Sequence, residues 1–274
     1  MLTNSTKLLE NAKENKSVIF HFNINNLEFT KYILEEANIL NKPVILGVSE
    51  SAAKYMGGYK TVSSMVKALI EELNIKIDVV LHLDHGRSIT ACEEAIDAGF
   101  TSIMYDGSRL SIEENIKNTK YLTNKYKKQN ISIEGELGAI GTRENEIAYT
   151  KVEDAIKYYK ETDIDSLAIA VGNVHGVYKG KPNINIKLIK EISDKLNIPL
   201  VLHGGSGISI ETFKESIKNG ISKININTEI QITWTNEVRK YLEENKEEYD
   251  PRKIISSGEE KVKEVVRTYL NIAW

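Results

Sequence analysis

Three histidines of this chain each follow an apolar stretch and are each followed directly by a glycine. They are His85 in VVLHLDHGR, His175 in GNVHG and His203 in LVLHGGSG. Three histidines from separate strands, with the fourth coordination position left open, make a catalytic zinc site rather than a closed structural one. A single histidine at a strand end is more often a hydrogen-bonded structural residue, so it is the shared pattern that indicates a metal.

Asp84 stands directly before His85, after a β-branched run that is typical of a buried strand. Neighbouring residues of a strand point to opposite faces of the sheet. The two side chains can therefore serve one site only at the fraying end of the strand, where Gly86 interrupts it. We interpret His82 as a core residue or a supporting residue of the site, and His21, inside the first expected strand, as structural.

Apolar runs alternate with amphipathic segments along the whole chain. Strands are expected at residues 18–23, 44–48, 77–83, 102–104, 131–137, 166–171, 199–202 and 223–226, and helices at 27–40, 62–73, 89–98, 111–127, 152–162, 186–196 and 210–218. Further helices are expected after a cap at Thr3 or Asn4, and at about 229–245 and 259–270. This rhythm predicts the α/β class, as a (β/α)8 TIM barrel with extra N- and C-terminal helices, in a single domain spanning 1–274. A doubly wound open sheet is the alternative, weakened because no GxGxxG follows the first strand.

Polar side chains stand at the carboxyl ends of all the expected strands. They are Asn23, Ser49, Asp84 with His85, Asp106, Glu136, His175, His203 and Asn225. In a barrel these ends form one rim, where residues far apart in the sequence converge. Glu134 and Glu136 share a face by strand parity, which lets both point inward. They would then serve the metal site or form a charge network that fills the barrel mouth.

The glycine-rich segment HGGSG, at 203–207, lies between an expected strand and the helix that begins near Ser209. Backbone N–H groups in such a segment, with a helix N-terminus behind them, can hold a phosphate. The segment 225–228 occupies the same place one unit later, and the loops after the last two strands of such barrels frequently bind phosphate. An ordinary tight turn explains one glycine but not a run that ends in Ser206. A metal beside a phosphate site indicates a phosphorylated, carbonyl-bearing sugar as the substrate.

Composition limits the partners and the compartment. The chain is 41% hydrophobic and 27% charged, with a formal net charge of −3, which is typical of a globular protein and gives no electrostatic reason to expect nucleic-acid binding. The single cysteine, Cys92, excludes an internal disulfide and favours a cytoplasmic location. We expect no secretory signal and no membrane partner, because no stretch is apolar enough over the required length.

Several longer motifs extend this interpretation. LHLDHG, IMYDGS with EENI downstream, IEGELGAIG, GNVHG, LVLHGGSG and KININTE occur in the order found in class II, zinc-dependent aldolases. The chain resembles this family, which includes fructose-bisphosphate and tagatose-bisphosphate aldolases, from FNINN at 22–26 to DPRK at 250–253.

The resemblance implies roles for particular residues. His85, His175 and His203 would bind the catalytic Zn2+, and Asp84 would transfer the proton of the hydroxyl at the bond that is broken. Residues that match a second or alternative divalent metal position are Asp106 and Glu136. The implied contacts to dihydroxyacetone phosphate are Gly176, Gly204, Gly205, Ser206, Asn225, Ile226, Asn227 and Thr228, while Asn23 and Ser49 match positions near the other phosphorylated end. The resemblance also implies a monovalent cation near the phosphate, and a homo-oligomer of two or more copies.

One loop departs from the family pattern. After IEGELG the chain reads AIGTRENEIAY, which is several residues shorter than the acidic segment beginning GGEED that is usual in the family. Arg143 and Asn145 replace two of its acids, whereas Glu144 stays in register with the family's second proton-transfer residue and is predicted to be catalytic. The short loop motivates one alternative, a non-catalytic barrel that binds sugar phosphates.

The expected function is reversible cleavage of fructose 1,6-bisphosphate to dihydroxyacetone phosphate and glyceraldehyde 3-phosphate. A tagatose-1,6-bisphosphate aldolase is the alternative within the family. GNVHG at 172–176 favours the fructose branch, because GTAHG is more usual among tagatose enzymes.

Overall fold

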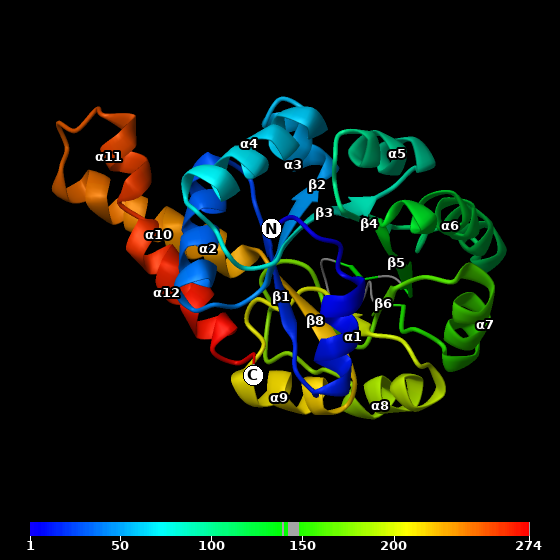
Figure 1. The fold of residues 1–274 in the computed structure, drawn as a ribbon. Helices are drawn as coiled ribbons and strands as arrows, with labels where there is room; N and C mark the ends of the chain where they lie inside the picture. Colours follow the sequence, from blue (N-terminus) through cyan, green and yellow to red (C-terminus); the bar gives the residue numbers. More distant parts are fainter. Residues whose placement is uncertain (139, 142–147, 274) are drawn as a thin grey trace.

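Eight parallel strands close into a barrel in the order β1 to β8, with helices around them (Figure 1). The structure is a computed structural model, and it describes residues 1–138, 140–141 and 148–273. The strands are β1 (Ile19–Asn23), β2 (Val44–Ser49), β3 (Val79–Gly86), β4 (Ser102–Tyr105), β5 (Ser132–Leu137), β6 (Ser166–Ile169), β7 (Leu200–Leu202) and β8 (Ile221–Ile226). The predicted TIM barrel is confirmed, and the open sheet is excluded because β1 pairs with β8.

The crossover helices follow the predicted segments to within a few residues. They are α2 (Leu27–Ile39), α4 (Tyr59–Glu72), α5 (Ile89–Asp97), α6 (Ile112–Tyr126) with the 3-10 turn η1 (Lys127–Gln129), α7 (Val152–Thr162), α8 (Ile186–Lys195) and α9 (Ile210–Lys218). Several begin at a side-chain cap: Asn26, Ser88, Ser111 and Ser209 each accept a hydrogen bond from a backbone N–H of the first turn. These caps fix where the four helices begin.

The extra helices at the two ends of the chain are also present. They are α1 (Thr6–Glu14), α10 (Thr228–Glu244), α11 (Pro251–Ser256) and α12 (Glu259–Leu270), and α10 and α11 project beyond the ring of helices (Figure 1). The short helices α3 (Glu50–Tyr55) and α11 were not predicted, because six residues are too few for a helical period. Among the described residues, no helix combines the length and apolarity needed to cross a membrane.

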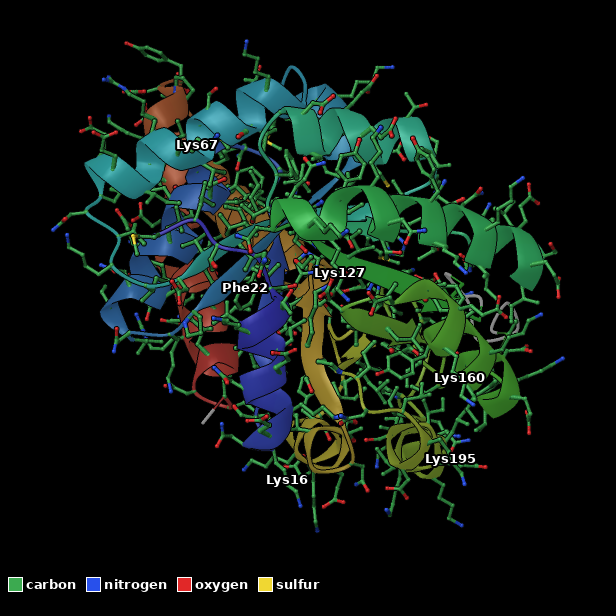
Figure 2. All side chains as sticks on the ribbon, turned by 45° about the vertical axis from the view of Figure 1, so that its right-hand side comes forward. Lys16, Phe22, Lys67, Lys127, Lys160 and Lys195 are labelled. Atoms are coloured by element: carbon green, nitrogen blue, oxygen red, sulfur yellow. The ribbon has the colours of Figure 1, made fainter. Side chains whose placement is uncertain are left out.

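The barrel has two kinds of apolar packing. Outward-facing strand residues, such as Phe22, are buried against the helices, while lysines such as Lys67 and Lys160 lie exposed at the surface (Figure 2). Inside the barrel, a small separate cluster is formed by Met104, Ala168 and Val201. The inward positions nearer the carboxyl ends of the strands are polar, and these positions form the site.

Candidate active site

A cavity of about 900 Å3 opens at the carboxyl ends of the strands. Most of the residues predicted from the sequence line it: Asn23, Ser49, Asp84, His85, Asp106, Glu136, His175, Gly176, His203, Gly204, Ser206, Asn225, Asn227 and Thr228. Two predicted contact residues lie behind the wall instead. Ile226 is buried in the apolar core against the helices, and Gly205 donates its N–H to the carbonyl of Asn225 at 2.9 Å. Glu144 lies outside the described residues.

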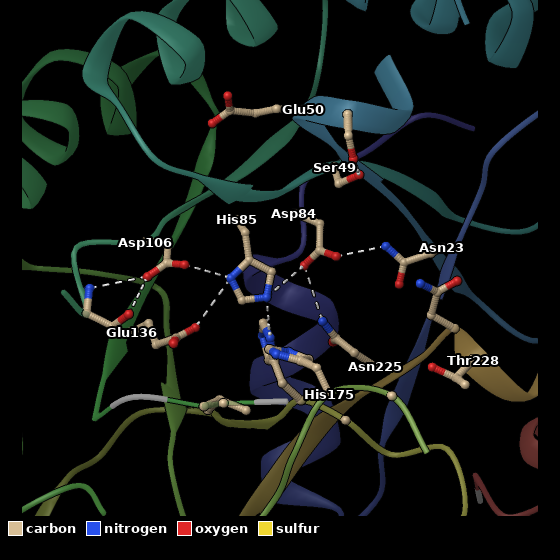
Figure 3. A pocket seen from close by; sticks show the side chains of 18 of the residues that line it. Asn23, Ser49, Glu50, Asp84, His85, Asp106, Glu136, His175, Asn225 and Thr228 are labelled. Carbon is tan, nitrogen blue, oxygen red and sulfur yellow. Dashed lines mark hydrogen bonds and ion pairs between the residues drawn. The ribbon is translucent and has the colours of Figure 1, made fainter. Parts of the chain in front are cut away.

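The backbone of β3 explains how two neighbouring side chains reach one site. Both Asp84 and His85 lie within β3, rather than beyond its regular part as the sequence had predicted. The pairing with β4 shifts register between Leu83 and Gly86, and His85 has a left-handed φ of 55°. A bulge of this kind re-aims a side chain. His85 therefore turns toward the cavity beside Asp84, as Figure 3 shows.

Three histidines converge at the centre of the cavity. Ligand atoms of His85, His175 and His203 all lie within 4.8 Å of one another, and Nδ1 of His203 is 3.1 Å from Nε2 of His85. Two nitrogens bound to one tetrahedral zinc at the usual bond length would be about 3.4 Å apart. The donor set and its spacing therefore fit a zinc ion with three protein ligands.

The electrostatic surroundings of these histidines also favour a cation. Burial lowers the pKa of His203, and it lowers the pKa of His175 to about 3, so both imidazoles are neutral ligands near neutral pH. Burial also acts to lower the pKa of His85, but the Asp84 charge and the Asp106 hydrogen bond outweigh it and raise this pKa to about 10. The acids around His85 thus stabilise a positive charge at this point of the cavity.

A second donor group shares His85. Its Nδ1 lies 2.9 Å from Oδ2 of Asp106 and 3.6 Å from Oε2 of Glu136, at the ends of β4 and β5. Oε2 of Glu136 is buried and has no hydrogen-bond partner among the described residues, and burial raises the pKa of this carboxyl to about 8. A buried carboxyl oxygen without a hydrogen-bond partner is costly, and a cation beside it would satisfy it. The pair fits the second or alternative metal position that the family resemblance implies.

A buried ion pair between Glu134 and Lys223 holds the ring of His203 in place. Oε1 of Glu134 lies 3.1 Å from Nε2 of His203, and Nζ of Lys223 donates to Oε2 of the same glutamate at 2.8 Å. A carboxylate on the far nitrogen of a ligand histidine fixes its tautomer and its ring orientation. The prediction that Glu134 points inward is confirmed. Lys223 was missed, although its parity with Asn225 along β8 was a signal for an inward position.

The other two histidines are not donors at this centre. His82 lies deeper in the barrel, with Nδ1 2.8 Å from Oγ of Ser102 and Nε2 3.5 Å from Nζ of Lys223. His21 packs edge-on against it, with ring centroids 5.6 Å apart. Both positions agree with the core roles that the sequence indicated.

Asp84 is held by two side-chain amides. Nδ2 of Asn23 donates to its Oδ2 at 2.7 Å, and Nδ2 of Asn225 approaches Oδ1 at 3.5 Å (Figure 3). Burial acts to raise the pKa of Asp84, but the surrounding histidines and Lys223 outweigh burial and hold it well below its usual range. Asp84 is therefore an ionised acceptor beside the metal position, with Oδ1 4.0 Å from Nε2 of His85.

The glycine-rich loops after β6 and β7 form another part of the wall. Gly204 has a φ of 64°, and a Cβ there would meet the carbonyl oxygen of Val174 at 2.0 Å, so only glycine fits this close approach. The Tyr178 hydroxyl accepts from the Val174 N–H at 3.1 Å and donates to the Gly204 carbonyl at 3.0 Å. It thereby joins the loop of His175 to the loop of His203. The Ser206 hydroxyl accepts from the Glu229 N–H at 3.2 Å, in the first turn of α10.

Charged residues at the cavity mouth were not predicted. Glu50, Arg87 and Arg109 all line the cavity, each one to three residues beyond a strand-end residue that the sequence had indicated. Oε1 of Glu50 accepts a hydrogen bond from the backbone N–H of Arg87 at 2.7 Å. Their position directly after the strand ends was the available signal.

Comparison with known proteins gives one family along the whole chain. The family model described as fructose-bisphosphate aldolase class-II matches residues 3–273. A Bacillus subtilis protein named 6-phospho-5-dehydro-2-deoxy-D-gluconate aldolase is 46% identical over 266 residues, covering 96% of this chain and 92% of that protein. A fructose-bisphosphate aldolase of Geobacillus stearothermophilus is 46% identical over 270 residues, covering 97% and 94%.

Solved structures agree with this result. The YdjI aldolase from Escherichia coli K12 superposes with a TM-score of 0.87 at 30% identity, covering 100% of this chain and 97% of that one. The fructose-bisphosphate aldolase of Campylobacter jejuni gives a TM-score of 0.85 at 26% identity, covering 99% and 95%.

Proposed function

The chain belongs to the class II fructose-bisphosphate aldolase family and is an aldehyde-lyase; on this premise we propose that it cleaves fructose 1,6-bisphosphate reversibly to dihydroxyacetone phosphate and glyceraldehyde 3-phosphate. Its cofactor is a zinc ion held by His85, His175 and His203. The observation that carries the proposal is the convergence of these three ligand atoms within 4.8 Å, beside the ionised Asp84, on the wall of one large cavity.

The chemistry divides between the metal and the chain. When bound, zinc supplies Lewis acidity that polarises the ketose carbonyl and stabilises the negative charge left by cleavage of the C–C bond. Asp84 accepts the proton of the hydroxyl on the carbon that becomes the aldehyde in cleavage, and returns it in condensation. Asn23 and Asn225 keep the carboxylate aimed at that hydroxyl, and Glu134 keeps the His203 ring in its ligating orientation. Glu144 is our candidate for the second proton transfer, on the triose carbon.

The phosphate of the triose half is placed against the loops after β6, β7 and β8. Gly176 and Gly204 expose backbone there, and Ser206, Asn227 and Thr228 line the same wall at the N-terminus of α10. Backbone N–H groups at a helix N-terminus favour an anion. A monovalent cation beside this phosphate is part of the proposal, as is a second divalent ion at Asp106 and Glu136.

A second substrate is favoured by a specific observation, the 46% identity to the relative named 6-phospho-5-dehydro-2-deoxy-D-gluconate aldolase. Aldol cleavage of that keto acid yields the same triose phosphate, but its aldehyde half ends in a carboxylate instead of a phosphate. Tagatose 1,6-bisphosphate differs from the fructose compound only in configuration at one carbon. All three substrates use the same metal and phosphate contacts, so the aldehyde half decides among them.

The test is a cleavage assay of the purified protein on the three substrates, with and without chelator. We expect the highest kcat/KM on fructose 1,6-bisphosphate, loss of turnover after exhaustive chelation and recovery with zinc. Full activity in chelator would refute the metal role. A higher kcat/KM on one of the other two compounds would reassign the substrate, and bound sugar phosphate without any turnover would indicate the non-catalytic barrel.

The organisation of the protein completes the proposal. We place it in the cytoplasm, as one domain over 1–274 that assembles into a dimer or larger homo-oligomer. The family match over 3–273 supports the single domain, and the single cysteine supports a reducing compartment.

A further inference from the structure

Two arginines line the same cavity as the metal ligands. Arg87 follows the end of β3 and Arg109 lies in the segment after β4, three residues beyond Asp106. They are the only lysine or arginine residues on the cavity wall within the part of the chain that the structure describes. Both side chains are exposed, so their charged ends are open to a ligand that enters the cavity.

The barrel places these arginines opposite the triose-phosphate loops. In a closed ring ordered β1 to β8, β3 lies four strands from β7, and β4 lies four strands from β8. The loops that carry Arg87 and Arg109 are therefore diametrically across the mouth from those that carry Gly204 and Asn227. Figure 3 shows this separation, with Asp106 and Thr228 on opposite sides of His85.

The guanidinium groups of Arg87 and Arg109 have no polar partner in the part of the chain that the structure describes. Neither makes a hydrogen bond or ion pair with any described residue, unlike Arg252 and Arg267, which pair with Asp250 and Glu36. The Arg87 backbone is held by Glu50, which fixes the start of the loop without engaging its guanidinium group. An arginine at a cavity wall without a carboxylate partner is suited to bind an anion, because its planar fork matches carboxylate and phosphate oxygens.

We propose that Arg87 and Arg109 supply the positive charge that binds the phosphate of the aldehyde half of the substrate, the end to which the sequence assigned Asn23 and Ser49. The inference rests on the proposed function, which places a ketose between the metal and the loops after β7 and β8. Its other half must then extend across the mouth toward β3 and β4. A phosphate monoester carries nearly two negative charges near neutral pH, and two guanidinium groups balance them. A carboxylate carries one charge, so this subsite selects a bisphosphate over a keto acid.

The experiment compares substrates that differ at this end only. Arg87→Gln, Arg109→Gln and the double variant are assayed on fructose 1,6-bisphosphate and on fructose 1-phosphate, whose aldehyde half is uncharged. Each single variant should lower kcat/KM on the bisphosphate by about tenfold or more, the double variant should lower it further, and all should retain the activity on fructose 1-phosphate. Lys117→Gln removes the same charge from an exposed position on α6, outside the cavity, and should change neither value.

The outcomes separate this subsite from the proposed function. If the wild-type protein cleaves the bisphosphate and the arginine variants leave the ratio of the two kcat/KM values unchanged, the subsite is refuted and the function stands. A parallel loss on both substrates also refutes it, because it indicates a structural role. If the wild type prefers 6-phospho-5-dehydro-2-deoxy-D-gluconate, the phosphate assignment fails together with the substrate. A wild type that cleaves none of these compounds overturns both proposals.

Discussion

The two ends of the barrel interior are built from the same strands and have opposite chemistry. At the amino-terminal end, Leu9 and Ala12 of α1 pack onto Ile19, Ile45 and Val80, the first inward residues of β1, β2 and β3. Two to four residues further along these strands, the inward positions hold His21 and Asn23, Gly47 and Ser49, and His82 and Asp84. One end is filled by buried apolar side chains, and the other is a polar cavity.

The comparison shows how one scaffold separates stability from function. Apolar burial at the amino-terminal end lowers the free energy of the folded state and takes no part in binding. At the carboxyl end, Glu136 retains a buried oxygen without a hydrogen-bond partner among the described residues, which weakens the fold unless a ligand satisfies it. Changes at the carboxyl end should therefore remove activity first, and changes at the amino-terminal end should remove stability first.

The largest effect should come from His203→Ala. The variant should lose its zinc, and its kcat should fall at least about a thousandfold, because Lewis acidity lowers the activation free energy by several kcal/mol. Its thermal unfolding should stay cooperative. Zinc content measured by atomic absorption, together with the cleavage rate, tests this. His82→Gln, inside the same barrel but not at the metal position, should keep its zinc. Stoichiometric zinc in His203→Ala would show that the ligand set is wrong.

Asp84→Asn separates proton transfer from metal binding. We expect kcat to fall by about 10²- to 10⁴-fold, the range for a lost general base, with the zinc content unchanged. Asp97→Asn, at an exposed position near the end of α5, is the matched control and should behave as wild type. A normal kcat in Asp84→Asn would remove this residue from the mechanism.

Leu9→Ala tests the opposite end of the barrel. Leu9 is fully buried in the cluster with Ile19, Ile45 and Val80, so its truncation should lower the free energy of unfolding by about 2–5 kcal/mol. Denaturant titration measures this, and kcat of the folded enzyme should not change. Lys7→Ala on the exposed face of the same helix should have little effect on either quantity. If kcat of the folded Leu9→Ala variant fell strongly, the two ends would not be independent.

The smallest effect is expected for the ion pair of Glu134 and Lys223, which orients His203. Glu134→Gln combined with Lys223→Met replaces the buried ion pair by neutral groups, which avoids leaving one charge unpaired. The zinc affinity should fall by about ten- to a hundredfold, as for other carboxylates behind ligand histidines, while saturating zinc restores most of the activity. Competition with a chromogenic chelator measures the affinity. An unchanged zinc affinity would limit the pair to a role in packing.

Much of the rim of the barrel could be predicted, because the ends of the strands can be recognised in the sequence. Apolar runs stop at polar residues such as Asn23, Asp106 and Asn225, and the TIM barrel rule brings such residues to one edge. Lys223 escaped prediction because it lies inside an apolar strand, where its partner Glu134 is 89 residues away. The arginines at the mouth escaped it because exposed loop residues have no periodic pattern.

The sequence by itself determined the eightfold alternation of strands and helices and the residues proposed as metal donors, since both follow from local patterns of apolar and polar residues. Only the tertiary structure decided which donors meet. Closure of the barrel brings His203 to His85 across 118 residues, and the bulge in β3 turns His85 to the same side as Asp84. Strand parity alone would have placed Asp84 and His85 on opposite faces of the sheet. The sequence gives no sign of the left-handed backbone at position 85, because the residue there is histidine and not glycine.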